Sequence, residues 1–156
     1  MNTQQERSLV ELGQAVAEAV CFFAHVDENL PDGEQTARTV LAHLVFWHRE
    51  YVAIVEALAA GQPPVLLQGR FPAFYQQASL EFASVPMPLL ATRLGEFQVR
   101  LDAALCVIPD WSADFPIKQG GKFTPVEERV PSLAAHIRNH VMALRKAERH
   151  ALALAY

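Results

Sequence analysis

Long apolar runs are missing from this chain of 156 residues, and none approaches the roughly 18 apolar residues that a membrane-spanning helix needs. The first eight residues are polar and lack the apolar segment of a secretory signal, so we expect a soluble, cytoplasmic protein. Basic residues are not in excess: the formal net charge is -4, and no Lys/Arg cluster predicts a nucleic-acid partner. Strand-type alternation of useful length and internal repeats are also missing.

Cysteine is scarce, and the two present, Cys21 and Cys106, form no CxxC pair. Each lies in an apolar helical stretch, so we expect two buried, reduced thiols that pack as small hydrophobic residues. Hydrophobic residues make up 51% of the chain and charged residues 19%, which is enough apolar material for one closed core. Residues 1–156 are therefore expected to form a single domain.

Apolar residues recur at spacings of three and four in several segments, which is the period of an amphipathic helix. Pro and Gly residues separate these segments and mark turns. The pattern predicts long helices over residues 4–26, 36–60, 89–107 and 124–153, with a shorter one over 72–82. Pro131 predicts either a kink in the last helix or a helix start just after Val130. We predict an all-α protein, an up-and-down four-helix bundle with a short extra helix between the second and third long helices.

Three of the six histidines form the most informative pattern. His136 and His140 are four residues apart, so they project from one face of the last helix and can chelate one ion. His43 lies beside the apolar stripe of the second long helix, which a bundle can place next to the last one. Three unpaired imidazoles in a core would cost about 1–3 kcal/mol each, and a metal satisfies all three. The alternative is separate histidines, each hydrogen-bonded to backbone or water.

Other polar residues of the second helix are weaker candidates. Glu50 lies two turns after His43 on the same face, so it is a candidate acceptor for an imidazole N–H or a fourth ligand. An exposed helix carboxylate is the alternative. His48 is expected at the surface or in an interface, because its neighbours Arg49 and Glu50 are polar.

The run Thr39-Val-Leu-Ala-His43-Leu-Val-Phe-Trp47, the later histidine pair and the four-helix layout resemble the DinB-like superfamily, also called YfiT-like metal-dependent hydrolases. The resemblance covers about residues 9–147. The stretches Gly61-Gln-Pro-Pro, Phe74-Tyr75 and 118–124 look like its ClbS/DfsB branch. Two departures stand out: residues 32–37 replace a Gly-x-Trp-Ser lead-in, and Ala143 stands where Gln is frequent.

The resemblance implies a divalent transition metal, nickel or zinc above all, on His43, His136 and His140, with an open coordination position. Members of the superfamily include thiol-dependent S-transferases that use bacillithiol or mycothiol and a mycothiol-dependent isomerase, and many form homodimers. On this basis a low-molecular-weight thiol would attack a small-molecule electrophile in a pocket beside Trp47 and Tyr51.

Three interpretations of function stay open. The first is a metal-dependent enzyme of transferase or hydrolase type that acts on a small molecule. The second is a ClbS-like protein that protects by binding a toxic small molecule without metal-dependent turnover. The third is a purely structural bundle whose histidines are hydrogen-bonded and metal-free.

Overall fold

The computed structural model describes residues 1–155, and most of them lie in helices. The predicted all-α class and the short extra helix are confirmed. The elements along the chain are α1 (Thr3–His25), β1 (Pro31–Asp32), β2 (Gln35–Thr36), α2 (Ala37–Ala59), α3 (Phe71–Glu81), α4 (Met87–Val107), β3 (Asp114–Phe115), β4 (Thr124–Pro125) and α5 (Val126–Ala155). The two strand pairs, which the sequence pattern does not predict, are antiparallel ribbons of two residues per strand.

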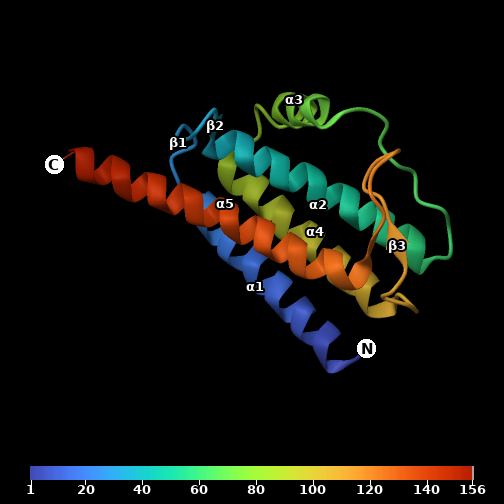
Figure 1. The fold of residues 1–156 in the computed structure, drawn as a ribbon. Coiled ribbons are helices and arrows are strands. Elements are labelled where there is room, and N and C mark those ends of the chain that lie inside the picture. The colour runs from blue at the N-terminus through green and yellow to red at the C-terminus, as the bar shows by residue number, and fades with distance from the viewer. Residues whose placement is uncertain (156) are drawn as a thin grey trace.

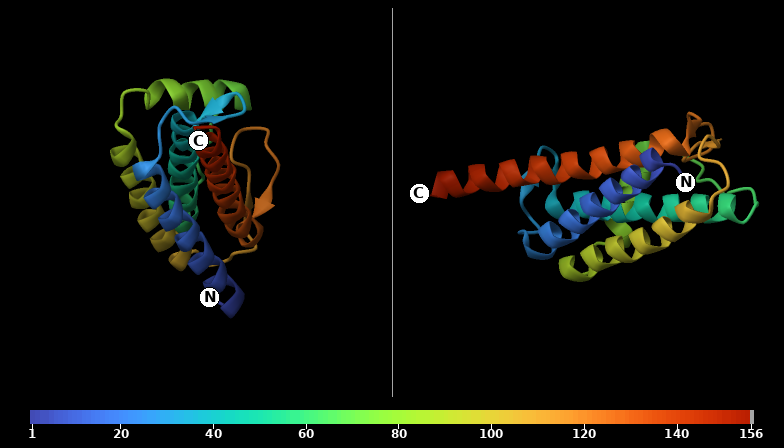
Figure 2. Two further views of the ribbon diagram at one scale, coloured as in Figure 1. Left: turned by 90° about the vertical axis from the view of Figure 1, so that its left-hand side faces the viewer. Right: turned by 90° about the horizontal axis from the view of Figure 1, so that it is seen from below.

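The four long helices form a bundle in which α1 packs between α4 and α5, and α2 packs on α4 (Figures 1 and 2). α2 and α4 run in the same direction. Arg38, near the start of α2, donates to the carbonyl of Val85 just before α4, and Glu56, near the end of α2, accepts from Arg100 toward the end of α4. α1 and α5 run in the opposite direction (Figure 1). Of the neighbouring pairs, α2 and α5 approach each other least closely.

The connection from α2 to α4 explains why the chain does not reverse direction at every long helix. It leads from the end of α2 back to the other end of the bundle, and α3 within it packs on α2 (Figure 1). Gly61 has φ +69° and directly follows the last turn of α2, a conformation that glycine adopts without strain. Pro72 and Pro88 stand in the first turns of α3 and α4, where a missing N–H costs nothing.

α5 begins at Val126, close to the start that the sequence pattern predicts. The alternative start just after Val130 is wrong, because the helix already includes Pro131. Thr124, a residue type that often caps helices, belongs to β4 instead. The first two N–H groups of α5 are satisfied by the preceding loop: Val126 donates to the carbonyl of Ala113 and Glu127 to that of Trp111. Backbone acceptors from the loop thus do what a capping side chain does elsewhere.

The core is one continuous apolar cluster to which all four long helices contribute. Cys21 and Cys106 are both exposed, so the prediction of buried thiols is wrong. Each lies within a helix whose buried residues fall on its other face, since Ala19 and Phe23 are buried around Cys21, and Ala104 and Leu105 beside Cys106. Among the described residues, no helix is long and apolar enough to cross a membrane.

Candidate metal centre

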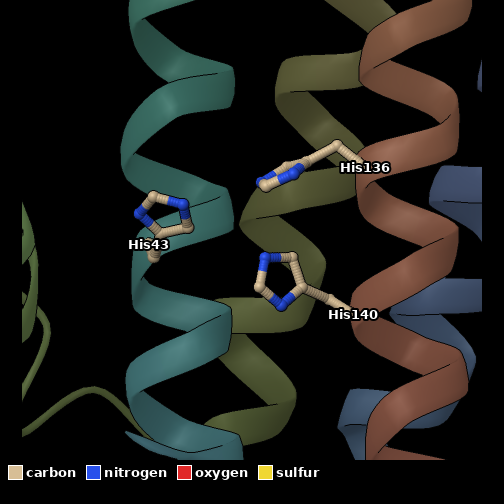
Figure 3. A group of neighbouring side chains, drawn as sticks. All are labelled: His43, His136 and His140. Carbon is tan, nitrogen blue, oxygen red and sulfur yellow. The ribbon is translucent and has the colours of Figure 1, made fainter.

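Three imidazole rings from two helices face one another across the gap between α2 and α5 (Figure 3). His43 projects from α2, and His136 and His140 project from α5 (Figure 3). The ring centroid of His43 lies 5.8 Å from that of His136 and 6.0 Å from that of His140. The two rings on α5 are 4.6 Å apart. The structure therefore brings together the three histidines that the sequence pattern groups.

The fold explains why these rings meet on this side of the bundle. His43 is buried within an unbroken buried stretch of α2, residues 40–48. His136 and His140 lie one turn apart on α5 beside Ile137, which is buried against the core. Because α2 and α5 are the loosest pair of neighbours, there is room between them for polar rings. Close-packed pairs such as α2 and α4 offer no such space.

Burial favours the neutral form of all three imidazoles, although His43 is buried, His140 half-buried and His136 exposed. The pKa of His43 is lowered to about 3, mainly by burial and also by charge repulsion from the nearby rings of His136 and His140. Burial also lowers the pKa of His136 and of His140; Asp32 on β1 partly opposes the shift at His140. A neutral imidazole keeps one nitrogen lone pair, which is the form that binds a metal ion.

The geometry fits a single transition-metal ion once the three imidazole rings move slightly closer together. One ligand atom from each histidine can be chosen so that all lie within 4.8 Å of one another. A tetrahedral ion with bonds of about 2.0–2.1 Å needs nitrogens about 3.3–3.4 Å apart. Side-chain rotation can supply that difference, and three neutral imidazoles suit zinc and nickel alike. Nδ1 of His43 is buried without a hydrogen-bond partner among the described residues, so hydrogen bonding does not explain this ring.

A cavity of about 240 Å³ opens beside the histidines, between α2, α3 and α5. Trp47 and Tyr51, the pocket candidates from the sequence, both line it. Burial raises the pKa of Tyr51, although Arg129 opposes the shift, so its phenol stays protonated at neutral pH. The lining is mostly apolar and aromatic: His43, Leu44, Trp47, His48, Tyr51, Phe71, Tyr75, Ile117, Ser132, Leu133, His136 and Ile137.

Glu50 does not join the three histidines. Its carboxylate lies 3.9 Å from Arg49, and the residue lines a separate surface hollow together with Glu81. Burial raises the pKa of Glu50, and Arg49 opposes that shift. Its position gives no support to a role as a fourth ligand.

His48 is not at the surface, so the sequence-based prediction for this residue is wrong. It is only 1% exposed, and its Nε2 lies 2.8 Å from Oε1 of Gln98 on α4. Arg49 and Glu50 are polar neighbours in sequence, but the helical rotation turns His48 toward α4 instead. Gln98, a polar residue within the apolar stripe of α4, was the available signal for a buried partner.

Sequence reasoning missed the part of the cavity that α3 supplies. Tyr75 stacks on His43, with ring centroids 4.4 Å apart and an angle of 29° between the planes. The ring of Phe71, one turn earlier on α3, packs near that of Trp47, with ring centroids 5.8 Å apart. α3 is too short for its pattern to show which face it buries. The only signal was the Phe74-Tyr75 pair within the ClbS-like stretches.

No family model matches this chain, and no curated protein matches it in sequence. Two solved structures match in fold. They are described as the mycothiol-dependent maleylpyruvate isomerase and a histidine-to-alanine mutant of that enzyme. Each match has a TM-score of 0.71 at 16% sequence identity over 92% of this chain. The chain corresponds to 63% of the length of those proteins. At this identity the likeness shows the fold alone: this chain has the all-α helical-bundle fold of these neighbours.

Proposed function

We propose that His43, His136 and His140 hold one divalent transition metal, nickel or zinc, and that the protein is a metal-dependent enzyme acting on a small molecule with a low-molecular-weight thiol. The observation that carries the proposal is the meeting of three imidazoles from two helices beside a mostly apolar cavity, which His43 and His136 line. The fold neighbours, described as mycothiol-dependent, support a thiol as the cosubstrate.

A metal ion in this position lowers the pKa of a bound thiol or water and so supplies a nucleophile near neutral pH. The surrounding residues do the rest. Trp47, Phe71 and Ile117 form apolar walls that exclude water and hold the carbon skeleton of a substrate. The protonated phenol of Tyr51 provides a hydrogen-bond donor in a mostly apolar lining, which also includes the hydroxyls of Ser132 and Tyr75.

The cavity favours thiol chemistry over hydrolysis. Among the described residues, no carboxylate or lysine lines it. The one further histidine, His48, has a pKa lowered by burial to about 4, which makes it a poor base. Hydrolysis of a stable bond normally uses a general acid or base, whereas a thiolate attacks without one. We therefore propose a transferase or isomerase type of reaction.

The test is elemental analysis of protein purified without a histidine tag. We expect close to one equivalent of nickel or zinc per chain, and less than about a tenth of an equivalent after His140→Ala. His150→Ala is the matched control, because His150 is an exposed histidine on the same helix, outside the cluster. Equal metal content in His140→Ala and the unmodified protein would refute the proposal.

Chelation separates the enzyme from the alternatives. A metal-dependent enzyme loses turnover of a thiol and an electrophilic probe such as 1-chloro-2,4-dinitrobenzene when its metal is removed, and regains it on reloading. A sequestering protein binds its small molecule equally well before and after chelation. A structural bundle contains no stoichiometric metal at all.

We also expect a homodimer. Val10 on α1 is 58% exposed and Val99 on α4 is 72% exposed, and both line one shallow hollow between these helices. Exposed apolar residues grouped in this way favour association. Sedimentation of the protein at micromolar concentration distinguishes the dimer from the monomer.

A further inference from the structure

The inference concerns Tyr75 of α3, and it rests on the proposed metal centre. We propose that Tyr75 is a positioning residue for the metal: its ring, stacked on His43, takes the place of the hydrogen bond that normally orients a metal-binding imidazole.

A metal-binding histidine usually donates its second ring N–H to a carboxylate, a backbone carbonyl or water, and this bond fixes the ring. His43 lacks such a partner. Its Nδ1 is buried and has no hydrogen-bond partner among the described residues. The side chain is only 6% exposed, so bulk water does not supply one. Among the described residues, no hydrogen bond at Nδ1 holds this ring toward α5; the Nδ1 of His48 is also unpartnered, but the Nε2 of that ring is held by Gln98.

The stacked ring of Tyr75 is the group placed to do so. Its centroid lies 4.4 Å from that of His43, nearer than the rings of His136 and His140, and the two planes are 29° apart. Stacking leaves the imidazole free to slide in its own plane but prevents it from tilting out of that plane. The ring nitrogens of His43 therefore stay in the plane that reaches toward α5.

The fold holds Tyr75 in place independently of any metal. The adjacent Phe74 is buried, and its ring centroid lies 5.6 Å from that of Trp47. Ala78, one turn later, is also buried. At the end of α3, Glu81 accepts two hydrogen bonds from Arg49 of α2. α3 is thus fastened to α2 on both sides of Tyr75, and the stacking surface is formed before an ion arrives.

The stack also favours the loaded state over the empty one. An imidazole bound to a dication loses electron density, and the electron-rich face of a tyrosine attracts an electron-poor ring more strongly than a neutral one. Removing the ring should therefore lower metal affinity and not only stability. Tyr75 is 40% exposed, so its hydroxyl can bond to water, and the aromatic face is the part that contacts His43.

The experiment measures zinc affinity of the reloaded full-length protein by competition with a chromophoric chelator. We expect Tyr75→Ala to lower the affinity about tenfold, the scale seen for groups that orient metal ligands. Tyr75→Phe should stay within twofold of the unmodified protein. Tyr75→Leu, which keeps bulk but removes the aromatic face, should fall at least threefold. Leu80→Ala, an exposed residue of the same helix, is the control and should change nothing.

Either of two results would overturn the inference: Tyr75→Leu binding zinc as tightly as Tyr75→Phe, or Tyr75→Phe losing as much affinity as Tyr75→Ala. If Tyr75→Ala does not fold, the comparison of the Leu and Phe variants still decides. The absorption spectrum of the cobalt-loaded protein supplies a second readout, because its visible bands shift when a ligand ring tilts. Metal retained by His140→Ala refutes the metal centre itself, whereas metal lost there but unaffected by the Tyr75 variants refutes only the role of Tyr75.

Discussion

Two histidines on the same helix face opposite sides of the bundle, and they are satisfied in different ways. His48 lies on the side of α2 that packs tightly on α4, where Gln98 provides a hydrogen-bond partner from within the chain. His43 lies on the looser side toward α5, beside two more imidazoles and a cavity. Both residues also line the cavity, and the Nδ1 of each has no hydrogen-bond partner among the described residues, so His43 differs from His48 by the two further imidazoles that face it.

The largest expected difference is in metal content. His43→Leu should reduce bound metal from about one equivalent to less than a tenth, because two imidazoles alone bind an ion weakly. His48→Leu should leave the metal content unchanged. The stability of metal-free His43→Leu should change by less than about 1 kcal/mol, since its Nδ1 loses no hydrogen bond. Elemental analysis and urea unfolding check both statements, and metal lost equally from the two variants would erase the contrast.

A core substitution on α4 should change the free energy of unfolding and leave metal binding unchanged. Leu101 on α4 is 2% exposed, and Leu101→Ala should lower the free energy of unfolding by about 2–5 kcal/mol through lost burial and a residual cavity. The metal content of the folded variant should not change. Val107→Ala is the control: this residue is 65% exposed on the same helix, and its change should be small. Thermal unfolding measures both.

The free energy of unfolding should depend on pH in part through the titration of His48. Burial lowers the pKa of His48 from 6.5 to about 4, partly opposed by Gln98. Between pH 6.5 and 4 the unfolded chain binds a proton at His48 that the folded chain does not bind. The free energy of unfolding is therefore highest above pH 6.5 and falls as the pH is lowered toward 4. In metal-free protein this loss should be roughly 2–3 kcal/mol.

His48→Gln is the variant that isolates this contribution, because the other titrating groups are common to both proteins. Urea unfolding at several pH values between 7 and 4 should show a shallower decline for His48→Gln than for the unmodified protein. Parallel curves would mean that His48 does not titrate differently in the folded state.

The smallest effect is expected at the exposed ion pair between Glu56 and Arg100, which joins α2 to α4 at the surface. The two side chains are 40% and 56% exposed. Glu56→Gln should change the free energy of unfolding by less than about 1 kcal/mol, because solvent and salt screen the pair. Unfolding at low and high salt checks this value. A larger loss would show that the close packing of α2 on α4 depends on surface charge.

The sequence predicted the helices better than it predicted their surroundings. Spacing located all five, and Gly61, Pro72 and Pro88 marked boundaries correctly because their effects are local. No local pattern reveals that the first N–H groups of α5 bond to the carbonyls of Ala113 and Trp111 rather than to a capping side chain. For the site, the grouping of His43 with the pair on α5 followed from periodicity and from the family resemblance, and their role as metal ligands stays a prediction.

The chain by itself determined which side chains share a helix face, because the rotation per residue in a helix is fixed. It thus determined that His136 and His140 project together and that His43 stands beside an apolar stripe. Only the tertiary structure decided that α2 lies next to both α4 and α5, which buried His48 against Gln98 and turned His43 toward His136 and His140. Only the packing of α3 brought Tyr75 onto His43, because contacts between distant segments depend on how the whole core closes.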